Sequence, residues 1–373
     1  MLTVIAPYLL IVFIIVILQY GKNLDEARTK KKLLLAFLIL FLFAGFRGNG
    51  DGDYFTYLRY STLITSFDSV LNFNFPMEIG FRLIAYFVNA TKIHQQFVII
   101  IMNAISIICI GVFINRHSSD KMLSVFLFLP FYFQFDMHAA RTAVAISISI
   151  LSFKYIVNRK FIKFVLVICL AAAFHSVAFI MIPIFFLKNM KIDVTSGIIT
   201  IVSVTIITAL ISVSKAFYAI LCFFRMNDIA ARYLHYMGSE AYGYNFSLLD
   251  LRLLIAIFLY ITAKNIITNA NENENMLINL TWMSTIIMIF FREHTVFVTR
   301  ISAFFTIYMI ILIPIIMARI VSNIDNNSNI SYRQKHNTSK DYYLANAFVI
   351  LFFTTYMSVY LFRYSVQYRF FVN

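Results

Sequence analysis

A glycine-rich polar stretch near residue 50 carries the residue types that bind sugars and phosphates. Residues 46–60 read FRGNGDGDYFTYLRY and follow a long apolar run. The stretch places Arg47 and Asp53 beside Tyr54 and Tyr57. Guanidinium groups grip phosphate oxygens, carboxylates accept hydrogen bonds from sugar hydroxyls, and tyrosine rings stack on sugar faces. We therefore expect this stretch to form one edge of an active site, and an ordinary solvated turn between two helices is the alternative.

A second acidic and basic pair follows Pro76, which should end any preceding helix. Glu78 could act as an acid or a base, and its spacing of four residues from Arg82 also predicts an ion pair on one helix face. The apolar stretch that contains Arg82 is short for a membrane crossing. We interpret it as an interfacial or re-entrant helix.

Three further arginines stand at predicted helix ends. Arg141 begins a helix rich in small residues, DMHAARTAVAISISI, and a helix amino terminus favours anions. Arg292 closes one apolar helix and Arg300 opens the next, so the two flank a short loop. Two arginines in this arrangement resemble a clamp for a diphosphate. The alternative is that these side chains extend to the lipid headgroups.

His175 lies inside residues 161–187, an apolar run too long for one crossing. We expect two short helices to meet there, with His175 at their apex. A histidine in this position can bind phosphate or transfer a proton near neutral pH, or it can simply hydrogen-bond to a carbonyl.

The polar loop 215–247 contains Arg225 and Arg232, which are seven residues apart and would share one helical face. Such a loop could cover a cleft or hold an acceptor sugar. An amphipathic surface helix would have the same pattern.

No cofactor or metal is predicted. Asp51 and Asp53 could bind a divalent cation through oxygen ligands, but the arginines already supply positive charge for phosphates, so the cation is the less favoured alternative. The three cysteines are scattered and suggest neither a disulfide framework nor a zinc site. Nucleotide-binding and hydrolase motifs are absent.

Composition predicts an all-α polytopic membrane protein, since 61% of the residues are hydrophobic and only 13% are charged. We expect a single membrane domain over residues 1–373, with roughly 11 to 12 transmembrane segments, some short or re-entrant. The outer loops 47–94 and 215–247 would form the active-site and acceptor loops. The first apolar segment lacks a basic leader and should remain as the first span.

Orientation follows from the basic segment 21–32, GKNLDEARTKKK, which the positive-inside rule places in the cytoplasm. Most lysines then lie inside, whereas most arginines lie outside or at the outer helix ends. Outward positive charge opposes the usual bias, so these arginines are expected to have an anionic ligand such as a lipid diphosphate. Nucleic acid is an improbable partner despite the net charge of +14, because the basic residues are distributed by membrane side.

The ordered motifs resemble the EpsG type of bacterial polysaccharide polymerases, which includes many Wzy O-antigen polymerases. The resemblance rests on Arg47 with Asp53, Tyr54 and Tyr57 after it, on Glu78 and Gly80 after a proline, on Arg141, and on Phe174-His175-Ser176. It implies a GT-C-like glycosyltransferase in the bacterial inner membrane, with its active site facing the periplasm. Such an enzyme would move a growing glycan from undecaprenyl diphosphate onto a lipid-linked oligosaccharide repeat unit.

The resemblance also implies roles for the candidate residues. The diphosphate would be bound by Arg47, Arg141, Arg292 and Arg300. The acceptor hydroxyl would be oriented or deprotonated by Asp53, Glu78 or His175, among which the sequence does not choose. Sugars and carrier would be positioned by Tyr54, Tyr57, Arg82, Arg225 and Arg232.

The expected partners are a second protein and lipid, and three other functions remain as alternatives. A separate chain-length co-polymerase is implied by the resemblance alone, and membrane lipid surrounds the chain. The main rival function is a lipid-linked oligosaccharide flippase or other transporter, although transporters place polar groups near the midplane in repeated halves and no repeat is visible here. An O-antigen ligase, which uses the same donor, is a further alternative, and a membrane acyltransferase a weaker one.

Overall fold

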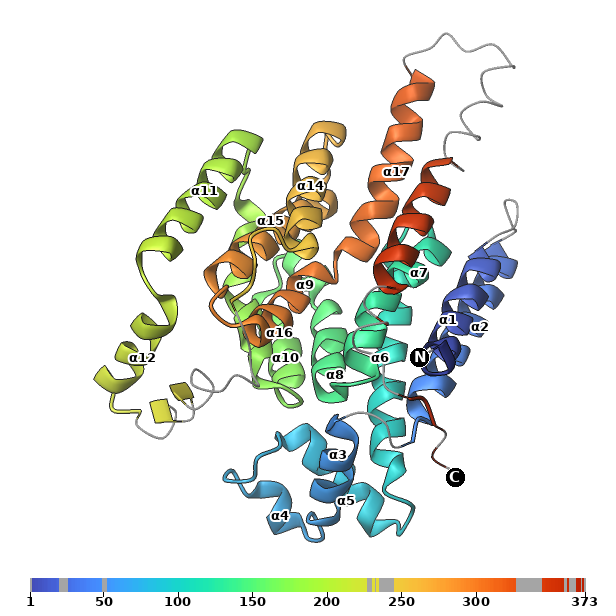
Figure 1. Ribbon diagram of the computed structural model, residues 1–373, viewed down its shortest axis with the longest axis vertical. Helices are drawn as coiled ribbons and strands as arrows, with labels where there is room; N and C mark the ends of the chain where they lie inside the picture. Colours follow the sequence, from blue (N-terminus) through green and yellow to red (C-terminus); the bar gives the residue numbers. More distant parts are fainter. Residues whose placement is uncertain are drawn as a thin grey trace. The chain divides into compact units, whose positions relative to one another are not determined.

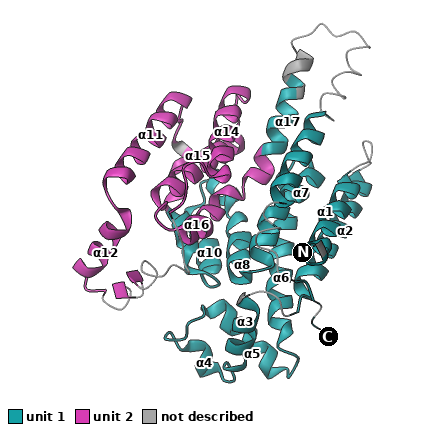
Figure 2. Ribbon diagram, in the orientation of Figure 1, with its two compact units in different colours: residues 1–182, 313–373 teal, residues 183–312 magenta. Residues whose placement is uncertain are grey.

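The computed structural model describes residues 2–19, 26–48, 52–226, 230–231, 233–234, 245–326, 344–358, 361, 367–369 and 371. Helices and no strands occur in these ranges (Figure 1), which agrees with the predicted all-α class. The chain divides into two compact units (Figure 2). Unit 1 comprises Met1–Ile182 and Ile313–Asn373, and unit 2 comprises Pro183–Leu312.

Unit 1 is built around a long apolar helix, α6 (Gln96–His117), which packs against α2 (Glu26–Gly45) and α8 (Ala140–Ile150). The other helices of this unit are α1 (Leu2–Gln19), α3 (Gly52–Thr62), α4 (Phe67–Leu71), α5 (Ile79–Ala90), α7 (Lys121–Phe131), the π-helical turn η1 (Tyr132–Asp136), α9 (Phe153–Val157) and α10 (Phe161–Ala172). A further helix covers Leu344–Ser358. Since α6 is apolar on every side, it can be buried against several neighbours at once.

The short helices α3, α4 and α5 lie side by side at one end of unit 1 (Figure 1). Asn89 of α5 ties this group together, because its Nδ2 donates to the carbonyl oxygens of Ser61 and Ile64, at 2.7 Å each. Asp53, Tyr54 and Tyr57 lie on α3, and Glu78 directly precedes α5.

Unit 2 is organised around α15 (Glu272–Phe290), which packs against α11 (Val194–Leu210), α14 (Leu251–Ile266) and α16 (Thr295–Thr306). The unit also contains α12 (Val213–Phe223). The indole nitrogen of Trp282 in α15 donates to the carbonyl of Gly197 in α11 at 3.2 Å. A Cβ at Gly197 would lie 2.0 Å from the Tyr260 hydroxyl, so glycine is required for the close approach of α11 and α14. Two elements cross the boundary between the units, the 3₁₀-helix η2 (Ser176–Asn189) and α17 (Met309–Asn326).

Two described helical segments are long and apolar enough to cross a membrane, Gln96–His117 and Ala140–Val157. Two bent helix pairs would raise that number to four, if each pair is one span. These pairs are Val194–Leu210 with Val213–Phe223, bent by 72°, and Thr295–Thr306 with Met309–Ile320, bent by 48°. Shorter apolar helices occur at Thr3–Gln19, Ile79–Ala90, Phe161–Ala172, Ser176–Lys188 and Leu344–Ser358. The apolar helices support a membrane protein, whereas the larger number of spans and the GT-C-like arrangement stay predictions.

Candidate active site

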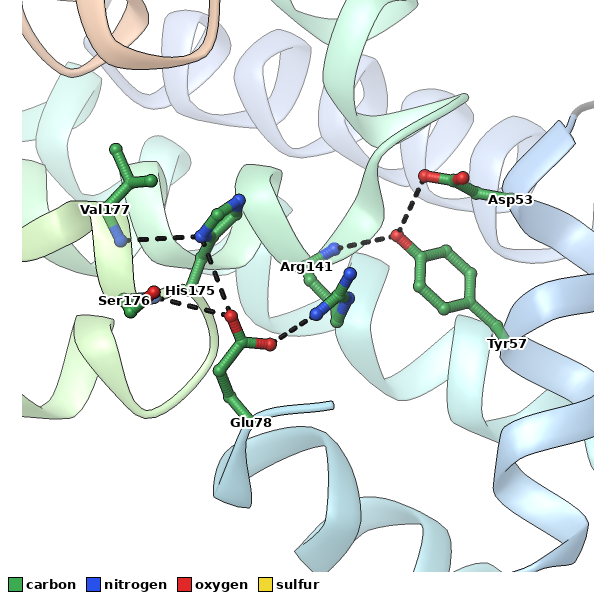
Figure 3. A network of polar contacts seen from close by, with 7 residues as sticks. All are labelled: Asp53, Tyr57, Glu78, Arg141, His175, Ser176 and Val177. Carbon is green, nitrogen blue, oxygen red and sulfur yellow. Dashed lines mark hydrogen bonds and ion pairs between the residues drawn. The ribbon is translucent and has the colours of Figure 1, made fainter. Parts of the chain in front are cut away.

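Glu78 is the centre of a polar network within unit 1 (Figure 3). Its Oε2 accepts a hydrogen bond from Nη1 of Arg141. Its Oε1 accepts one from the backbone N–H of Ser176 at 3.4 Å and lies 3.7 Å from Nδ1 of His175. The side chains of Glu78 and Arg141 are each 21% exposed, so the network is only partly buried. Three segments distant in sequence therefore meet at one carboxylate.

Local sequence explains how Glu78 reaches this place. Pro76 interrupts the chain before α5, and Glu78 occupies the N-cap position of that helix. The Glu78 side chain makes no capping hydrogen bond to α5. Its carboxylate is therefore available to Arg141.

Gly80 brings the start of α5 close to the turn before η2. Its backbone N–H donates to the carbonyl of Ala173 at 2.6 Å. A Cβ at this position would lie 2.7 Å from that oxygen and 3.0 Å from the Phe174 ring. Glycine is thus needed for the approach that sets Glu78 beside His175 and Ser176.

His175 lies in the turn between α10 and η2, so the predicted break of the 161–187 run is confirmed. The backbone N–H of Val177 donates to Nδ1 of His175 at 3.5 Å. With Nδ1 as acceptor, the proton of the neutral ring resides on Nε2. The 3.7 Å separation from Glu78 is longer than a hydrogen bond, so the two groups form an ion pair when the ring is protonated. The arrangement can transfer or stabilise a proton beside the carboxylate.

Tyr57 and Asp53 of α3 approach the same arginine from another side (Figure 3). The backbone N–H of Arg141 donates to the Tyr57 hydroxyl at 3.4 Å, and that hydroxyl donates to Oδ2 of Asp53 at 3.5 Å. The guanidinium carbon of Arg141 lies 5.9 Å from the centre of the Tyr57 ring. Burial raises the pKa of Tyr57 to about 12, although the positive charge of Arg141 acts in the opposite direction. Tyr57 therefore remains a hydrogen-bond donor near neutral pH.

Arg141 is the second residue of α8, as the sequence predicted for a helix start. Apart from its bond to Glu78, the guanidinium keeps a buried Nε without a hydrogen-bond partner in the described part of the chain. The amino terminus of α8 adds the partial positive charge of the helix dipole. The surroundings of Arg141 therefore suit an anionic oxygen.

Arg47 and Tyr54 are buried residues whose side chains hydrogen-bond to protein groups. Arg47 is only 3% exposed, and its Nη1 donates to the carbonyl of Ala44 at 2.9 Å. The Tyr54 hydroxyl donates to Oε1 of Gln96 at 2.8 Å. Both side chains are thus buried and hydrogen-bonded to protein groups, and their predicted roles in substrate binding stay predictions.

Gln96 is a buried polar residue that the sequence reasoning missed. Its Nε2 donates to the carbonyls of Gly45 at 2.9 Å and Arg47 at 2.8 Å. With the bond from Tyr54, the amide joins the end of α2 to α3 and α6. The only signal in the sequence is a glutamine at the very start of a long apolar run.

The predicted ion pair between Glu78 and Arg82 was wrong. Arg82 is buried within α5, and its Nη1 donates to the carbonyl of Asn72. Its guanidinium carbon also lies 5.9 Å from the centre of the Phe73 ring. Glu78 occupies the N-cap position before the helix and not a position on its side, so its carboxylate bonds to Arg141. Arg82 bonds to the preceding turn instead.

The predicted diphosphate clamp lies in unit 2, where residues 291–294 connect α15 to α16. Nη2 of Arg292 donates to the carbonyl of Thr208 at 3.2 Å, and its own carbonyl accepts the N–H of Phe246 at 2.6 Å. Arg300 is half-buried in α16 and makes no hydrogen bond or ion pair with the described residues. Arg292 thus has a structural partner, whereas no such partner is seen for Arg300 among the described residues.

The remaining predicted positions are two arginines of the loop 215–247 and the alternative cation site. Arg225 is exposed just after α12 and has a positive φ of 56°. Arg232 and Asp51 lie outside the described residues. Within the described ranges, no group of three or more His, Cys, Asp or Glu side chains could hold a metal ion. The alternative cation site at Asp51 and Asp53 therefore stays a hypothesis.

The comparisons with known proteins identify a family for this chain. The model of the EpsG family matches residues 30–333. No curated protein and no solved structure matches the chain. All residues of the Glu78 network lie inside the matched range.

Proposed function

The chain belongs to the EpsG family, and from this premise we propose that it is a polysaccharide polymerase of the bacterial inner membrane. It transfers a growing glycan from undecaprenyl diphosphate onto a lipid-linked oligosaccharide repeat unit at the periplasmic face. One observation carries the proposal within the family, namely the Glu78 carboxylate set between the cation of Arg141 and the imidazole of His175. A base next to an anion-binding group is what glycosyl transfer from a diphosphate needs.

Glu78 serves as the base in this reaction. The acceptor hydroxyl oxygen attacks the anomeric carbon of the donor glycan, and the bond between that carbon and the diphosphate oxygen breaks. The hydroxyl proton moves to the carboxylate at Oε1, beside His175 and the Ser176 N–H. His175 can then take up the proton and release it to solvent. General base catalysis of this kind contributes roughly 10²- to 10⁴-fold to a rate.

Arg141 stabilises the leaving group. Negative charge develops on the diphosphate as the glycosidic bond breaks, and a fixed guanidinium near it lowers the barrier without reorganisation. The Nε of Arg141 provides a donor for a phosphate oxygen, and the amino terminus of α8 adds partial positive charge beside it. Since Arg141 also holds Glu78, the same side chain keeps base and leaving group at a fixed separation.

The remaining residues position substrates. Tyr57 and Asp53 present a hydroxyl and a carboxylate beside Arg141 and suit an acceptor sugar. In unit 2, Arg300 stays a proposed diphosphate contact, and Arg225 and Arg232 stay proposed contacts of the carrier, as the sequence predicts. No cofactor is required, since the diphosphate is the leaving group. The fold is GT-C-like in this proposal, and a chain-length co-polymerase is a partner.

The test is reconstitution of the purified protein in liposomes with undecaprenyl-diphosphate-linked repeat units and no nucleotide sugar. We expect a ladder of multiples on a gel from the wild type and a loss of about a hundredfold or more in rate for Glu78→Gln. Glu272→Gln is the matched control, because Glu272 is a 67% exposed carboxylate that pairs with Lys188 in unit 2.

Other products would identify the rival functions. Repeat units that appear on the opposite leaflet without a ladder would indicate a flippase. A single transfer of preformed glycan to a different acceptor would indicate a ligase. A full ladder from Glu78→Gln would remove Glu78 as the base.

A further inference from the structure

Residues 367–369 and 371 lie alongside the turn that follows α2. The N–H of Gly48 donates to the carbonyl of Arg369 at 2.6 Å, and the N–H of Phe371 donates to the carbonyl of Phe46 at 3.2 Å. These two bonds flank Arg47 and have the pattern of antiparallel backbone pairing. Both segments belong to unit 1. The backbone around Arg47 is thus tied to a segment more than 300 residues away in the chain.

Tyr368 anchors this segment. Its ring stacks on Phe43 with centres 4.1 Å apart and planes 8° apart, and its hydroxyl donates to the Phe43 carbonyl at 2.8 Å. The ring also meets Tyr8 edge-on at 6.3 Å. Burial raises the pKa of Tyr368 well above its usual value, so the hydroxyl stays protonated and keeps its hydrogen bond.

The last four carbonyls of α2 all have partners, which is unusual at a helix end because these groups lack partners within the helix. Within the turn, the N–H of Phe46 bonds to Leu42 at 3.2 Å and Nη1 of Arg47 bonds to Ala44 at 2.9 Å. The two other carbonyls depend on distant residues. Tyr368 supplies the donor for Phe43, and Gln96 supplies the donor for Gly45.

A continuous series of contacts leads from this helix end to the candidate site. Gln96 also bonds to the Arg47 carbonyl at 2.8 Å and accepts the Tyr54 hydroxyl at 2.8 Å. Tyr54 is one turn before Tyr57 on α3, and Tyr57 accepts the backbone N–H of Arg141 at 3.4 Å. Movement of the Arg47 turn would therefore displace Tyr57 relative to Arg141.

We propose that Gln367, Tyr368, Arg369 and Phe371, here called the strap, fix the Arg47 turn. Tyr368 then acts as a positioning residue for the Tyr57–Arg141 contact. The effect on catalysis rests on the proposed polymerase function. The strap lies beyond residues 30–333, the range that the family model matches. It acts through α3 and does not touch the reacting atoms.

The first test compares Tyr368→Ala and Tyr368→Phe with Phe348→Ala. The control residue Phe348 is 69% exposed and lies in the helix Leu344–Ser358, which precedes Tyr368 in the chain. We expect Tyr368→Ala to lower kcat for polymerisation by about tenfold to a hundredfold, since small misplacements of catalytic groups have effects of this size. KM should change much less, and Tyr368→Phe should retain most activity through the ring stack. Phe348→Ala should match the wild type. A wild-type kcat for Tyr368→Ala would overturn the proposal.

The second test restores the strap with a covalent bond. Facing residues of an antiparallel pair have Cα atoms roughly 5.5 Å apart, which suits a disulfide. Phe46→Cys and Phe371→Cys are therefore introduced into Tyr368→Ala, with Cys109→Ala, Cys169→Ser and Cys222→Ser to remove the native thiols. Oxidation should restore kcat, and reduction should abolish the gain. A purely stabilising tyrosine would give a variant that regains thermal stability without regaining kcat, and that result contradicts the proposal.

Crosslink formation separates failure of the strap from failure of the proposed polymerase function. Formation of the Phe46→Cys/Phe371→Cys crosslink is measured by mass spectrometry without any substrate. Absence of the crosslink would overturn the strap even if the wild type gives a ladder. A formed crosslink with no wild-type ladder would overturn the polymerase proposal and support the strap contact.

Discussion

Gly80 and Ala173 are joined by a backbone hydrogen bond of 2.6 Å, and no side chain fits between them at Gly80. This contact sets the start of α5 against the turn that carries His175. The geometry of the carboxylate at Glu78 therefore depends on the absence of a side chain two residues later. Such a dependence can be tested without touching any charged group.

Gly80→Ala should reduce both stability and polymerisation. The added methyl would lie 2.7 Å from the Ala173 carbonyl, a backbone atom that cannot move aside cheaply. Overpacking of this kind costs about 1–3 kcal/mol. Gly111→Ala is the control, because its Cβ would meet only the Phe37 ring at 3.3 Å and a ring can shift. Thermal unfolding in detergent and the ladder assay check both effects, and equal behaviour of the two variants would refute this account.

Arg141→Ala should abolish polymerisation while the protein remains in the membrane. The change removes the partner of Glu78 and the proposed diphosphate contact together. Arg141→Lys should recover little activity, since an ammonium lacks the planar fork that holds two oxygens at once. Membrane content is measured by immunoblot and product length by gel. Long glycan from Arg141→Ala would show that neither role is needed.

Local features of the candidate site could be predicted from the sequence. The break at residues 173–175 followed from an apolar run too long for one crossing, and the start of α5 followed from Pro76. Arg141 was placed at a helix start because small residues follow it. Each of these inferences used only neighbours within a few turns of the chain.

The pairings across the fold could not be predicted in this way. Glu78 and Arg141 are separated by 63 residues, whereas Arg82 was the partner visible in the local pattern. The N-cap position turned the carboxylate away from that partner. Gln96 was missed for the same reason, because its role depends on the end of α2 and on Tyr54. Burial of Arg47 likewise follows from packing and not from its glycine-rich surroundings.

Gln96→Leu should destabilise the protein strongly. It would leave the carbonyls of Gly45 and Arg47 and the hydroxyl of Tyr54 without their partner in a buried place. Each unsatisfied buried group costs about 1–3 kcal/mol. A double-mutant cycle with Tyr54→Phe should give a coupling of about 0.5–3 kcal/mol in the free energy of unfolding. Additive effects would mean that the Tyr54–Gln96 bond contributes nothing.

Alkaline pH should destabilise the protein through Tyr57. Burial raises its pKa from 10.0 to about 12 in the folded protein. The proton-bound form is thus favoured by folding, so this contribution is complete below about pH 10 and is lost as the pH rises towards 12. The Tyr57→Phe variant lacks this dependence. Melting temperatures of the two proteins between pH 8 and 11 should therefore converge at the alkaline end, and parallel curves would argue against the shift.

Arg300→Ala and Arg292→Ala should separate binding from stability within unit 2. Arg292 bonds to the Thr208 carbonyl, so its removal leaves a buried acceptor and lowers the melting temperature. Arg300 has no hydrogen bond or ion pair with the described residues, so Arg300→Ala should melt like the wild type. If Arg300 binds the diphosphate, the Arg300→Ala variant should still melt normally but should give no ladder of glycan products on the gel. Normal long-chain glycan from Arg300→Ala would remove it from the clamp and leave Arg141 as the proposed diphosphate contact.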